Sequence, residues 1–332
     1  MPVFIYGMGN GADKILAASK HFGITIAGFF ASDEFVRGHF FRGHKVHTLA
    51  EIEAAAGDFA AVAAFGSNRP EILERFRALS KKHKFYSPDV PVCGDSLFDR
   101  AFYEKHREEI AEAEKLFCDE KSRRLYKNII DYKISGDISF LENDSDSAGD
   151  IIKEAASEKA ERGELVYADL GAYDGDTVRL FAEHFPYKKI YAFEPNEKNF
   201  RKLCDKTKHL SNIEYINKAA WDKTEEIAFS DTDNRNNNAF SGGGKLIPAA
   251  RADDFFTDAD IVKLDVEGAE RQALSGLSEN IKNGATVICA VYHRSEDIFE
   301  IPLMFKKMRP ESTFKLRKVP YVPAWDVFLI AL

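Results

Sequence analysis

The chain has 332 residues, two to three times the size of a typical compact domain, so we expect two domains. Hydrophobic residues make up 45% of the sequence, which is enough for buried cores and argues against intrinsic disorder. With 54 acidic and 46 basic side chains the formal net charge is -8, which argues against a general affinity for nucleic acid.

The N-terminus shows no secretory signal, and no uncharged apolar run approaches the roughly 18 residues of a membrane span. We therefore expect a cytoplasmic protein that does not insert into membranes. The four cysteines lie far apart and form no C-x-x-C pair, which removes the usual zinc and redox motifs and suggests reduced thiols. No compact set of ligands argues for a metal, so no metal ligands are assigned, and the sequence leaves open whether a metal assists. The sequence leaves the oligomeric state open.

Residues 1–95 alternate short apolar runs with segments of helical periodicity, the pattern of a parallel sheet covered by helices. This predicts a small Rossmann-like α/β domain. The predicted strands are Val3–Tyr6, Ile24–Phe30 and Ala60–Phe65, and the predicted helices are Ala12–Phe22, Leu49–Ala56 and Pro70–Leu79.

Residues 96–160 are expected to form a helical connector. Between Leu97 and Tyr132 the sequence is dense in Glu, Lys, Arg and Leu, and apolar residues recur at helical spacing. The polar segment Glu142–Gly149 has the composition of a loop.

Residues 161–332 return to alternating strands and helices and form the larger α/β domain. Pro320 and Pro323 between the last two strands suggest an antiparallel ending to an otherwise parallel sheet. The predicted strands are Glu164–Leu170, Lys189–Phe193, Ile213–Ile216, Ile261–Leu264, Thr286–Val291, Thr313–Lys318 and Val327–Ala331, and the predicted helices are Thr177–His184, Lys198–Lys206, Ala269–Ile281 and Phe299–Met308.

The most informative segment is Val166–Thr177, VYADLGAYDGDT. An apolar strand runs into a turn that contains Gly171 and Gly175, and a helix follows. Glycine lets the backbone of such a turn approach a ligand closely. In open α/β sheets the crevice at the carboxyl end of the first strand is the usual ligand site. The alternative is a tight turn with no ligand.

Acidic residues indicate the kind of ligand. Asp169, Asp174 and Asp176 surround the turn and would repel the pyrophosphate that a helix N-terminus otherwise attracts. Glu194 ends the next strand, in YAFEPN, where a carboxylate can accept both hydroxyls of a ribose. A ligand with a ribose, an ammonium and a sulfonium fits this turn better than NAD, so S-adenosylmethionine is the expected cofactor.

A third charged element is Ile261–Arg271, IVKLDVEGAER. By the two-residue period of a strand, Lys263, Asp265 and Glu267 point in one direction, and Gly268 begins a helix. Charges at the end of a buried strand are costly unless they are paired or used. The alternative is an ion pair between Lys263 and a carboxylate that has only a structural role.

Together these segments resemble the successive motifs of FkbM-type methyltransferases, S-adenosylmethionine-dependent enzymes that generally methylate hydroxyl oxygens of sugars and other natural products. The resemblance covers residues 164–331. Many relatives have Asn-Ile where this chain has Tyr173-Asp174. The motifs are DLGAYDGDT, FEPN, NKAAWD at Asn217–Asp222, RADDF at Arg251–Phe255 and KLDVEGAE, of which the last is the most specific.

The resemblance implies a class I methyltransferase sheet, mostly parallel with an antiparallel last strand. It also implies that Asp169 and Gly171 line the methionine end of the cofactor, that Glu194 binds the ribose and that Ala219 lies against the adenine. The full expected set of cofactor-binding residues is Asp169, Gly171, Asp174, Gly175, Thr177, Glu194, Ala219 and Asp265.

Methyl transfer to a neutral hydroxyl needs alignment, exclusion of water and a base that removes the proton. Asp265 and Glu267 are candidates for the base. His293, in AVYHRSED at the end of the following strand, is a third candidate, although a lone histidine is more often structural. The polar segment Ser230–Lys245 is either a surface loop or a lid over the site.

The first domain has a glycine turn of its own. Gly7–Ala12 satisfies G-x-G-x-x-[GA] between a strand and a helix, and Asp33 follows the second strand. Gly28–Val46 resembles the matching segment of the N-terminal domains of sugar-nucleotide acyltransferases, which hold the nucleotide of an activated sugar. The resemblance implies a nucleotide-linked or glycan acceptor, and the alternative is a degenerate scaffold.

The leading hypothesis is therefore an S-adenosylmethionine-dependent O-methyltransferase that acts on a small-molecule, sugar or nucleotide-sugar acceptor. An NAD(P)-dependent oxidoreductase that uses the first glycine turn is the rival enzyme, although no hydride-transfer constellation is evident. The third hypothesis is a non-catalytic nucleotide-binding scaffold.

Overall fold

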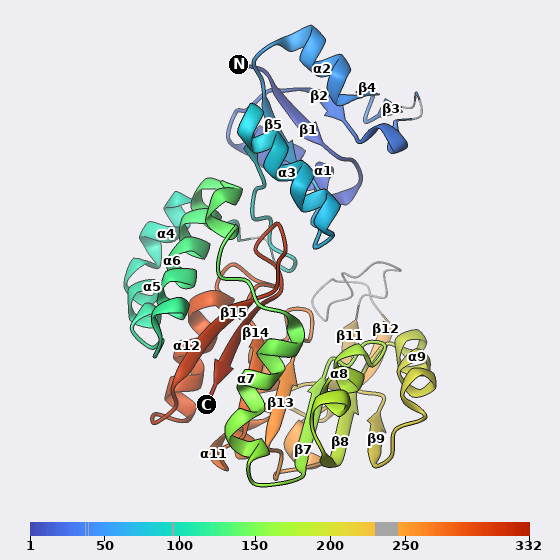
Figure 1. The fold of residues 1–332 in the computed structure, drawn as a ribbon, viewed down its shortest axis with the longest axis vertical. Helices are drawn as coiled ribbons and strands as arrows, with labels where there is room; N and C mark the ends of the chain where they lie inside the picture. Colours follow the sequence, from blue (N-terminus) through green and yellow to red (C-terminus); the bar gives the residue numbers. More distant parts are fainter. Residues whose placement is uncertain (37, 39, 95, 230–244) are drawn as a thin grey trace.

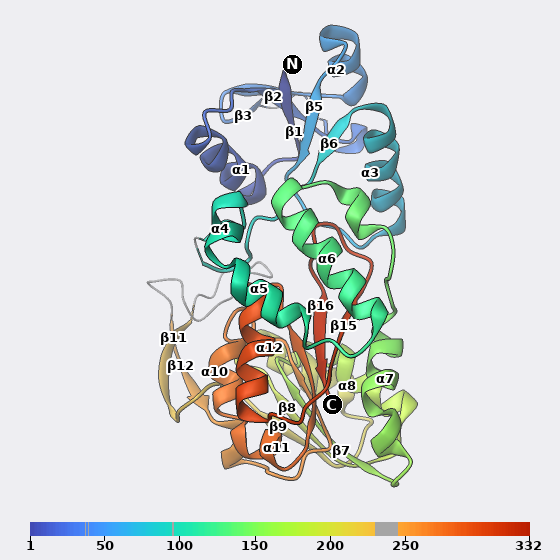
Figure 2. The same ribbon diagram turned by 90° about the vertical axis from the view of Figure 1, so that its left-hand side faces the viewer.

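The computed structural model describes residues 1–36, 38, 40–94, 96–229 and 245–332. The chain builds a smaller α/β unit from its N-terminal part and a larger one from its C-terminal part, with helices beside the junction (Figures 1 and 2). This confirms the predicted α/β fold class. No helix among the described residues is both long and apolar enough to cross a lipid bilayer.

The N-terminal unit is a six-stranded sheet with the order β3-β4-β2-β1-β5-β6. Only β3 runs antiparallel to its neighbour. In β1, Ile5 pairs with Phe29 on one side and Val62 on the other, and it is fully buried. The strands are β1 (Val3–Tyr6), β2 (Ile26–Phe30), β3 (Phe40–Phe41), β4 (His44–His47), β5 (Ala60–Ala63) and β6 (Lys84–Tyr86).

Three helices cover this sheet, and their ends follow from local sequence signals. Before α2, Thr48 and Glu51 form a capping box that satisfies two otherwise unpaired amides. In α3, which carries proline in its first turn, Leu73, Phe76 and Leu79 recur at helical spacing and are buried. The helices are α1 (Asn10–His21), α2 (Leu49–Ala56) and α3 (Pro70–Lys82).

A helical segment follows and contacts both sheets. In α6, the Tyr132 hydroxyl donates to the carbonyl of Ser87 at 2.6 Å, on the side of the N-terminal unit. The Ser122 hydroxyl of the same helix accepts from the amide of Leu316 at 2.8 Å, in the C-terminal sheet. The helices of this segment are α4 (Arg100–Lys105), α5 (Arg107–Glu114), α6 (Glu120–Ser135) and α7 (Ala148–Ala160).

The C-terminal unit is a seven-stranded sheet with the order β15-β16-β14-β13-β7-β8-β9. Only β16 runs antiparallel to its neighbours, which confirms the predicted antiparallel ending. The strands are β7 (Leu165–Leu170), β8 (Tyr187–Phe193), β9 (Ile213–Ile216), β13 (Ile261–Leu264), β14 (Thr286–Ala290), β15 (Phe314–Lys318) and β16 (Val327–Ala331).

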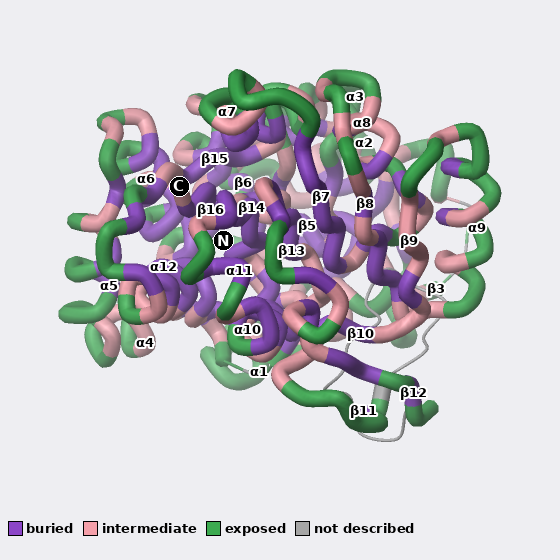
Figure 3. The backbone as a smooth tube through the Cα atoms, turned by 90° about the horizontal axis from the view of Figure 1, so that it is seen from below, coloured by how far each residue is buried: buried purple, intermediate pink, exposed green. Residues whose placement is uncertain are grey.

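The central strands β7, β13 and β14 are buried along their whole length (Figure 3). This is the environment of a parallel sheet covered on both faces, and it explains their nearly continuous apolar sequences. The helices of this unit are α8 (Asp176–His184), α9 (Glu197–Thr207), α10 (Glu270–Ser275), α11 (Ser278–Lys282) and α12 (Asp297–Met308), and a small separate sheet contains β10 (Ala219–Ala220), β11 (Glu225–Phe229) and β12 (Lys245–Ala250).

Two backbone contacts join the N-terminal unit to the C-terminal one. Ser67 exchanges hydrogen bonds of 2.8 and 3.1 Å with Val322, in the loop between β15 and β16. The amide of Cys93 donates to the carbonyl of His293 at 2.9 Å. The N-terminal unit therefore reaches the loop that follows β14.

The structure departs from the predicted elements in several places. The helix predicted over Ala269–Ile281 is split into α10 and α11. Gly276 passes so close to Trp221 that a Cβ would lie 1.9 Å from its carbonyl oxygen, and the chain bends there. The strands β3, β4, β6, β10, β11 and β12 were not predicted, and the helix α7, which lies within the predicted helical connector, was not placed individually. The predicted loop or lid lies, over residues 230–244, outside the described part of the chain.

Candidate functional site

The turn between β7 and α8 is tightly packed. Gly171 and Gly175 have φ angles of 88° and 81°, which disfavour any residue with a Cβ. A Cβ on Gly171 would lie 1.9 Å from the carbonyl oxygen of Asp265. The amides of Gly171 and Ala172 both donate to the carbonyl of Phe193, at 3.0 and 2.8 Å. Glycine therefore brings the ends of β7, β8 and β13 together.

Beneath this turn lies a buried ion pair. The ammonium of Lys263 lies 3.3 Å from Oδ1 of Asp169, and its pairing partner is fully buried. Oδ2 of Asp169 accepts from the hydroxyls of Thr177 and Tyr167. Burial opposes the charge of Lys263, but Asp169 raises the pKa of the ammonium above its ordinary value.

Two predicted cofactor residues, Asp169 and Thr177, thus contact each other. Their polar atoms are engaged inside the protein, so we interpret them as residues that shape the turn. The ammonium of Lys263 also lies 3.4 Å from the carbonyl of Gly171, which ties the ion pair to the turn itself. An ion pair between Lys263 and a carboxylate, which the sequence offered as an alternative, is present, and the carboxylate is that of Asp169.

The next acid along the turn, Asp174, faces a helix. Its carboxylate forms an ion pair with Lys206 of α9, and its side chain is 17% exposed. Tyr173, before it, is exposed and has a φ of 49°, an uncommon value for a residue with a Cβ. If Asp174 binds the cofactor as predicted, its carboxylate must either give up the ion pair with Lys206 or bind both groups at once.

Glu194 lies directly after β8 and is 6% exposed. Its two carboxylate oxygens accept from the amides of Tyr173 and Asn196, at 2.9 and 2.8 Å. Burial raises the pKa of Glu194 to about 7, although these amides stabilise the charged form. Each carboxylate oxygen can accept a second hydrogen bond, so the group retains the capacity to bind a ribose diol.

Ala219, predicted to lie against the adenine, is in β10. It pairs with Ala249 of β12 and is 7% exposed. Asn217, two residues earlier, donates its side-chain amide to the carbonyl of Glu194 at 2.8 Å. The NKAAWD motif is therefore anchored to the loop that carries Glu194.

The three predicted candidates for the base come together after β13 and β14. Nε2 of His293 lies 3.6 Å from Oδ1 of Asp265 and 3.5 Å from Oε2 of Glu267. The strand period used to align Asp265 with Glu267 does not apply, because β13 ends at Leu264 and Glu267 has a φ of 53° in the following turn. The turn, and not the strand, directs Glu267 toward His293.

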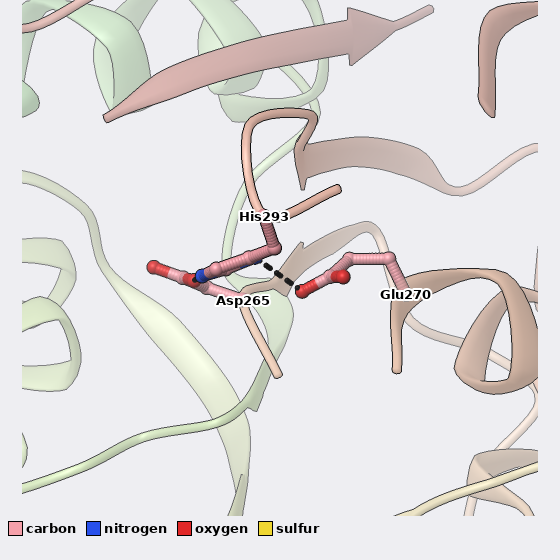
Figure 4. A group of neighbouring side chains, drawn as sticks. All are labelled: Asp265, Glu270 and His293. Atoms are coloured by element: carbon pink, nitrogen blue, oxygen red, sulfur yellow. Dashed lines mark ion pairs between the residues drawn. The ribbon is translucent and has the colours of Figure 1, made fainter. Parts of the chain in front are cut away.

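A fourth residue, Glu270, was not predicted as part of this group. Figure 4 shows the ring of His293 between Asp265 and Glu270, with the ion pair to Glu270 marked. Nδ1 of His293 lies 2.9 Å from Oε1 of Glu270, and both side chains are 1% exposed. Glu270 is the last residue of the KLDVEGAE motif, so the sequence already marked it as part of the most specific segment. Its buried position could not be read from a helix of only six residues.

The charges in this group decide which member can accept a proton. Burial opposes the charge of His293, but Glu270, Glu267 and Asp265 raise the pKa of His293 to about 10. This shift favours the protonated imidazole at neutral pH, so a carboxylate is the better candidate for the base, and a catalytic role of His293 stays a prediction. Partial burial, with Asp265 and Glu270 nearby, raises the pKa of Glu267 to about 7, although His293 acts against this shift. Because 39% of its side chain is exposed, the carboxylate is open to solvent.

The same group bears on the expectation about a metal, for which the sequence assigned no ligands. Asp265, Glu270 and His293 offer ligand atoms within 4.8 Å of one another, a compact set that the sequence spacing did not show. The two carboxylates face different ring nitrogens, Nε2 and Nδ1. Neither ring nitrogen makes a hydrogen bond within the described part of the chain, so these contacts are electrostatic and the expectation about a metal stays a prediction.

The N-terminal unit also contributes to this site, which the sequence did not indicate. Sγ of Cys93 lies 3.1 Å from the carbonyl oxygen of Glu267. A Cβ on Gly268 would lie 2.7 Å from the same sulfur. The turn that carries Glu267 is thus held by the segment that leaves the first unit.

Comparisons with known proteins agree with this architecture. Residues 169–316 match the model of the methyltransferase FkbM domain. Methyltransferase FkbM from Methylobacillus flagellatus KT has a similar structure over 100% of this chain and 90% of its own, with a TM-score of 0.73 and 14% identity. A search of curated proteins gave no significant match.

Other solved structures are similar over the C-terminal half. A putative rRNA-methylase from Clostridium thermocellum matches 53% of this chain and 93% of its own, with a TM-score of 0.35 and 11% identity. Fibrillarin from Aeropyrum pernix, solved with natively bound S-adenosyl-L-methionine, matches 54% and 73%, with a TM-score of 0.33 and 15% identity. The family model, which spans the turn from Asp169, the Glu194 loop and the Asp265–Glu270 turn, shows that residues 169–316 are a methyltransferase domain of the FkbM family.

Proposed function

We propose that the protein is an S-adenosylmethionine-dependent O-methyltransferase that acts on a hydroxyl of a sugar, glycan precursor or related metabolite. The observation that carries the proposal is the position of Glu267, a partly exposed carboxylate in the turn after β13, 3.5 Å from the imidazole of His293. A neutral hydroxyl needs such a base, because its proton must leave as the new carbon–oxygen bond forms. The resemblance to FkbM-type enzymes supports the sugar-like acceptor.

The cofactor would lie along the crevice between the glycine turn and the Glu194 loop. S-adenosylmethionine supplies the methyl group on a positively charged sulfonium. Glu194 accepts hydrogen bonds from the ribose hydroxyls. Each of its carboxylate oxygens accepts one amide hydrogen bond, from Tyr173 or Asn196, and can accept a second one. Asp169 and Asp174 are paired with Lys263 and Lys206, so Glu194 supplies the negative charge that a cationic cofactor would meet there. The Lys263–Asp169 pair holds the turn in shape from beneath.

Glu267 accepts the proton of the acceptor hydroxyl at a carboxylate oxygen. His293 keeps this carboxylate in place from 3.5 Å away, and Glu270 orients the imidazolium from its other nitrogen. The proton then leaves Glu267 for solvent, to which the side chain is partly open. Asp265 shares the imidazolium and is the alternative base among the predicted residues.

The test is methyl transfer with isotope-labelled S-adenosylmethionine and a panel of hydroxyl, amine and carboxylate acceptors, with sugars and nucleotide sugars among the hydroxyl compounds. We expect formation of S-adenosylhomocysteine only with hydroxyl acceptors, and mass spectrometry should place the label on oxygen. Transfer to nitrogen or carbon would contradict the proposed acceptor class. Failure to bind S-adenosylmethionine in calorimetry would contradict the proposed cofactor.

A further inference from the structure

A cavity of about 280 Å³ lies at the carboxyl edge of the N-terminal sheet, away from the crevice beside Glu194. Its walls come from four segments: the turn after β1, the residues after β5, the strand-like segment 87–92 and the loop between β15 and β16. Both α/β units therefore build it. The residues lining it on the sheet side include Met8, Asn10, Gly11, Ala64 and Phe65.

The cavity lies where the order of the parallel strands reverses. The chain passes from β1 to β2 on one side, and later returns to β5 on the other side of β1. In open α/β sheets, ligands bind in the crevice at this point. A Cβ on Gly11 would lie 1.9 Å from the carbonyl oxygen of Ala64, so glycine lets α1 approach β5. Gly9 has a φ of 86° and open space where a Cβ would be.

The charge of the cavity favours an anion. Of the described residues that line it, Lys14 alone carries a charge, and its ammonium lies 3.2 Å from the carbonyl of Pro91. The neighbouring acid, Asp13, is paired with Arg42 through two hydrogen bonds of 2.8 and 2.7 Å. The first turn of α1 also has no side-chain cap, which leaves backbone amides available to an anion.

A second observation points to a flat ring. The indole of Trp325, in the loop between β15 and β16, is partly exposed, while its Nε1 is buried and has no hydrogen-bond partner among the described residues. Trp325 lines the cavity together with Phe65 and Pro323. The buried Nε1 does not open to the cavity, so the aromatic and apolar surfaces of these residues are what the cavity offers to the ring of a base. The volume is close to the lower end of small-molecule sites, which suits one nucleotide better than a dinucleotide.

The cavity is adjacent to the methyltransferase turn along the chain. Val92 lines it, and the next residue, Cys93, contacts the carbonyl of Glu267 through Sγ and that of His293 through its amide. A molecule bound in the cavity therefore touches the segment that holds both catalytic-site loops.

We propose that this cavity binds a nucleoside diphosphate, with the phosphates beside Lys14 and the first turn of α1 and the base beside Trp325. The nucleotide is the handle of a nucleotide-linked acceptor whose hydroxyl reaches Glu267. The role as acceptor handle rests on the proposed methyl transfer, whereas nucleotide binding itself does not.

The experiment is calorimetric titration of the full chain with UDP, ADP, NAD and S-adenosylmethionine, on the wild type and three variants. Lys14→Met removes the charge but keeps most of the stem, and Trp325→Leu removes the aromatic surface but keeps an apolar side chain. Lys20→Met, at the exposed end of the same helix, is the matched control. We expect UDP or ADP to bind, with affinity reduced roughly tenfold or more by Lys14→Met, since a charge-assisted contact is lost. Trp325→Leu should weaken binding roughly fivefold, since stacking of the base is lost, and the control should not.

Retained binding of S-adenosylmethionine shows that a variant is folded. The proposal is overturned if neither UDP nor ADP binds at millimolar concentration, if both variants bind them as the wild type does, or if NAD alone binds. These outcomes leave the cofactor proposal standing. Loss of S-adenosylmethionine binding in the wild type, with nucleotide binding intact, would instead contradict the proposed function.

Discussion

The two glycine turns of this protein share a backbone design but differ in charge. Each follows a central parallel strand, β7 or β1, and leads into a helix whose N-cap is a glycine with positive φ and no side-chain cap. Around the turn after β7, Asp169 and Asp174 are paired with Lys263 and Lys206, and the carboxylate of Glu194 has no such cation beside it in the described structure, whereas the cavity after β1 is lined by one charged residue among those described, Lys14. The backbone design is shared, and we propose that the side chains around each turn decide which ligand it takes.

Individual glycines of the two turns differ in how tightly they are packed. Gly171 lies against the carbonyl of Asp265, and Gly11 lies equally close to the carbonyl of Ala64, whereas Gly9 has open space where a Cβ would be. The contact of Gly171 fixes the relative positions of three strand ends and hence of Glu194 and Glu267. Gly9 leaves backbone exposed between Met8 and Asn10, which line the cavity together with residues of the other unit.

The largest effect is expected from Glu267→Gln. If catalysis depends on a base at the acidic turn, this variant lowers kcat by roughly 10²- to 10⁴-fold, the usual contribution of a general base. Because the pKa of Glu267 is raised to about 7 and the charged form is the active one, the wild-type kcat should rise as the pH passes from 6 to 8. The variant should lose this dependence in an initial-rate assay at saturating cofactor.

Glu226→Gln, an exposed glutamate on β11, is the control and should keep the wild-type rate. A kcat for Glu267→Gln within threefold of the wild type would mean that Asp265 or solvent removes the proton.

The packing difference predicts unequal effects of adding one methyl group. Gly9→Ala should cost about 1–3 kcal/mol of unfolding free energy, from backbone strain alone. Gly171→Ala should cost that amount plus about 1–3 kcal/mol for the clash with the Asp265 carbonyl. Urea denaturation measures both. Equal losses would show that the turn after β7 can relax, and that its tight packing is not needed to position Glu194 and Glu267.

Glu194→Gln tests the carboxylate in the ribose role. Because burial raises the pKa of Glu194 to about 7, the carboxylate becomes protonated as the pH falls through 7. The ribose hydroxyls stabilise the charged form, so the wild type should bind S-adenosylmethionine about tenfold more weakly at pH 6 than at pH 8. Calorimetry of the glutamine variant should show weak binding without this slope. If the affinity of the variant for S-adenosylmethionine still depends on pH, a group other than Glu194 causes the pH dependence.

The sequence predicted the parallel sheets well because their central strands are nearly continuous apolar runs. β7, β13 and β14 were found within a residue or two of their observed ends. Most of the strands it missed are short or at sheet edges, and the exception is β12, the middle strand of the small separate sheet. β10 has two residues, and β4, His44–His47, reads as polar although Val46 is buried. For such strands, pairing with neighbours decides the structure, and pairing is not a local signal.

The site was predicted in part. Asp265, Glu267 and His293 converge because parallel strands deliver their carboxyl ends to one edge, a rule that needs only the strand order. Two features could not be read in this way. Glu270 was hidden because its burial depends on how α10 packs, and Cys93 because its contact with Glu267 joins residues from two units. The pKa of His293 follows from these neighbours, so its protonation could not be predicted from its position alone.

The smallest effect is expected at Asp33, the counterpart of Glu194 in the N-terminal unit. Both acids follow the second strand of their sheets, but Glu194 is buried at its crevice, whereas Asp33 is exposed and does not line the cavity. Asp33→Asn should therefore change the affinity for UDP or ADP by less than about twofold, since no hydrogen bond to the ligand is lost. A tenfold loss in calorimetry would mean that Asp33 binds a ribose as Glu194 is proposed to do. Both turns would then bind the ribose of a nucleoside through a carboxylate. The charges around each turn would decide only which group on the ribose is favoured, a sulfonium or a diphosphate.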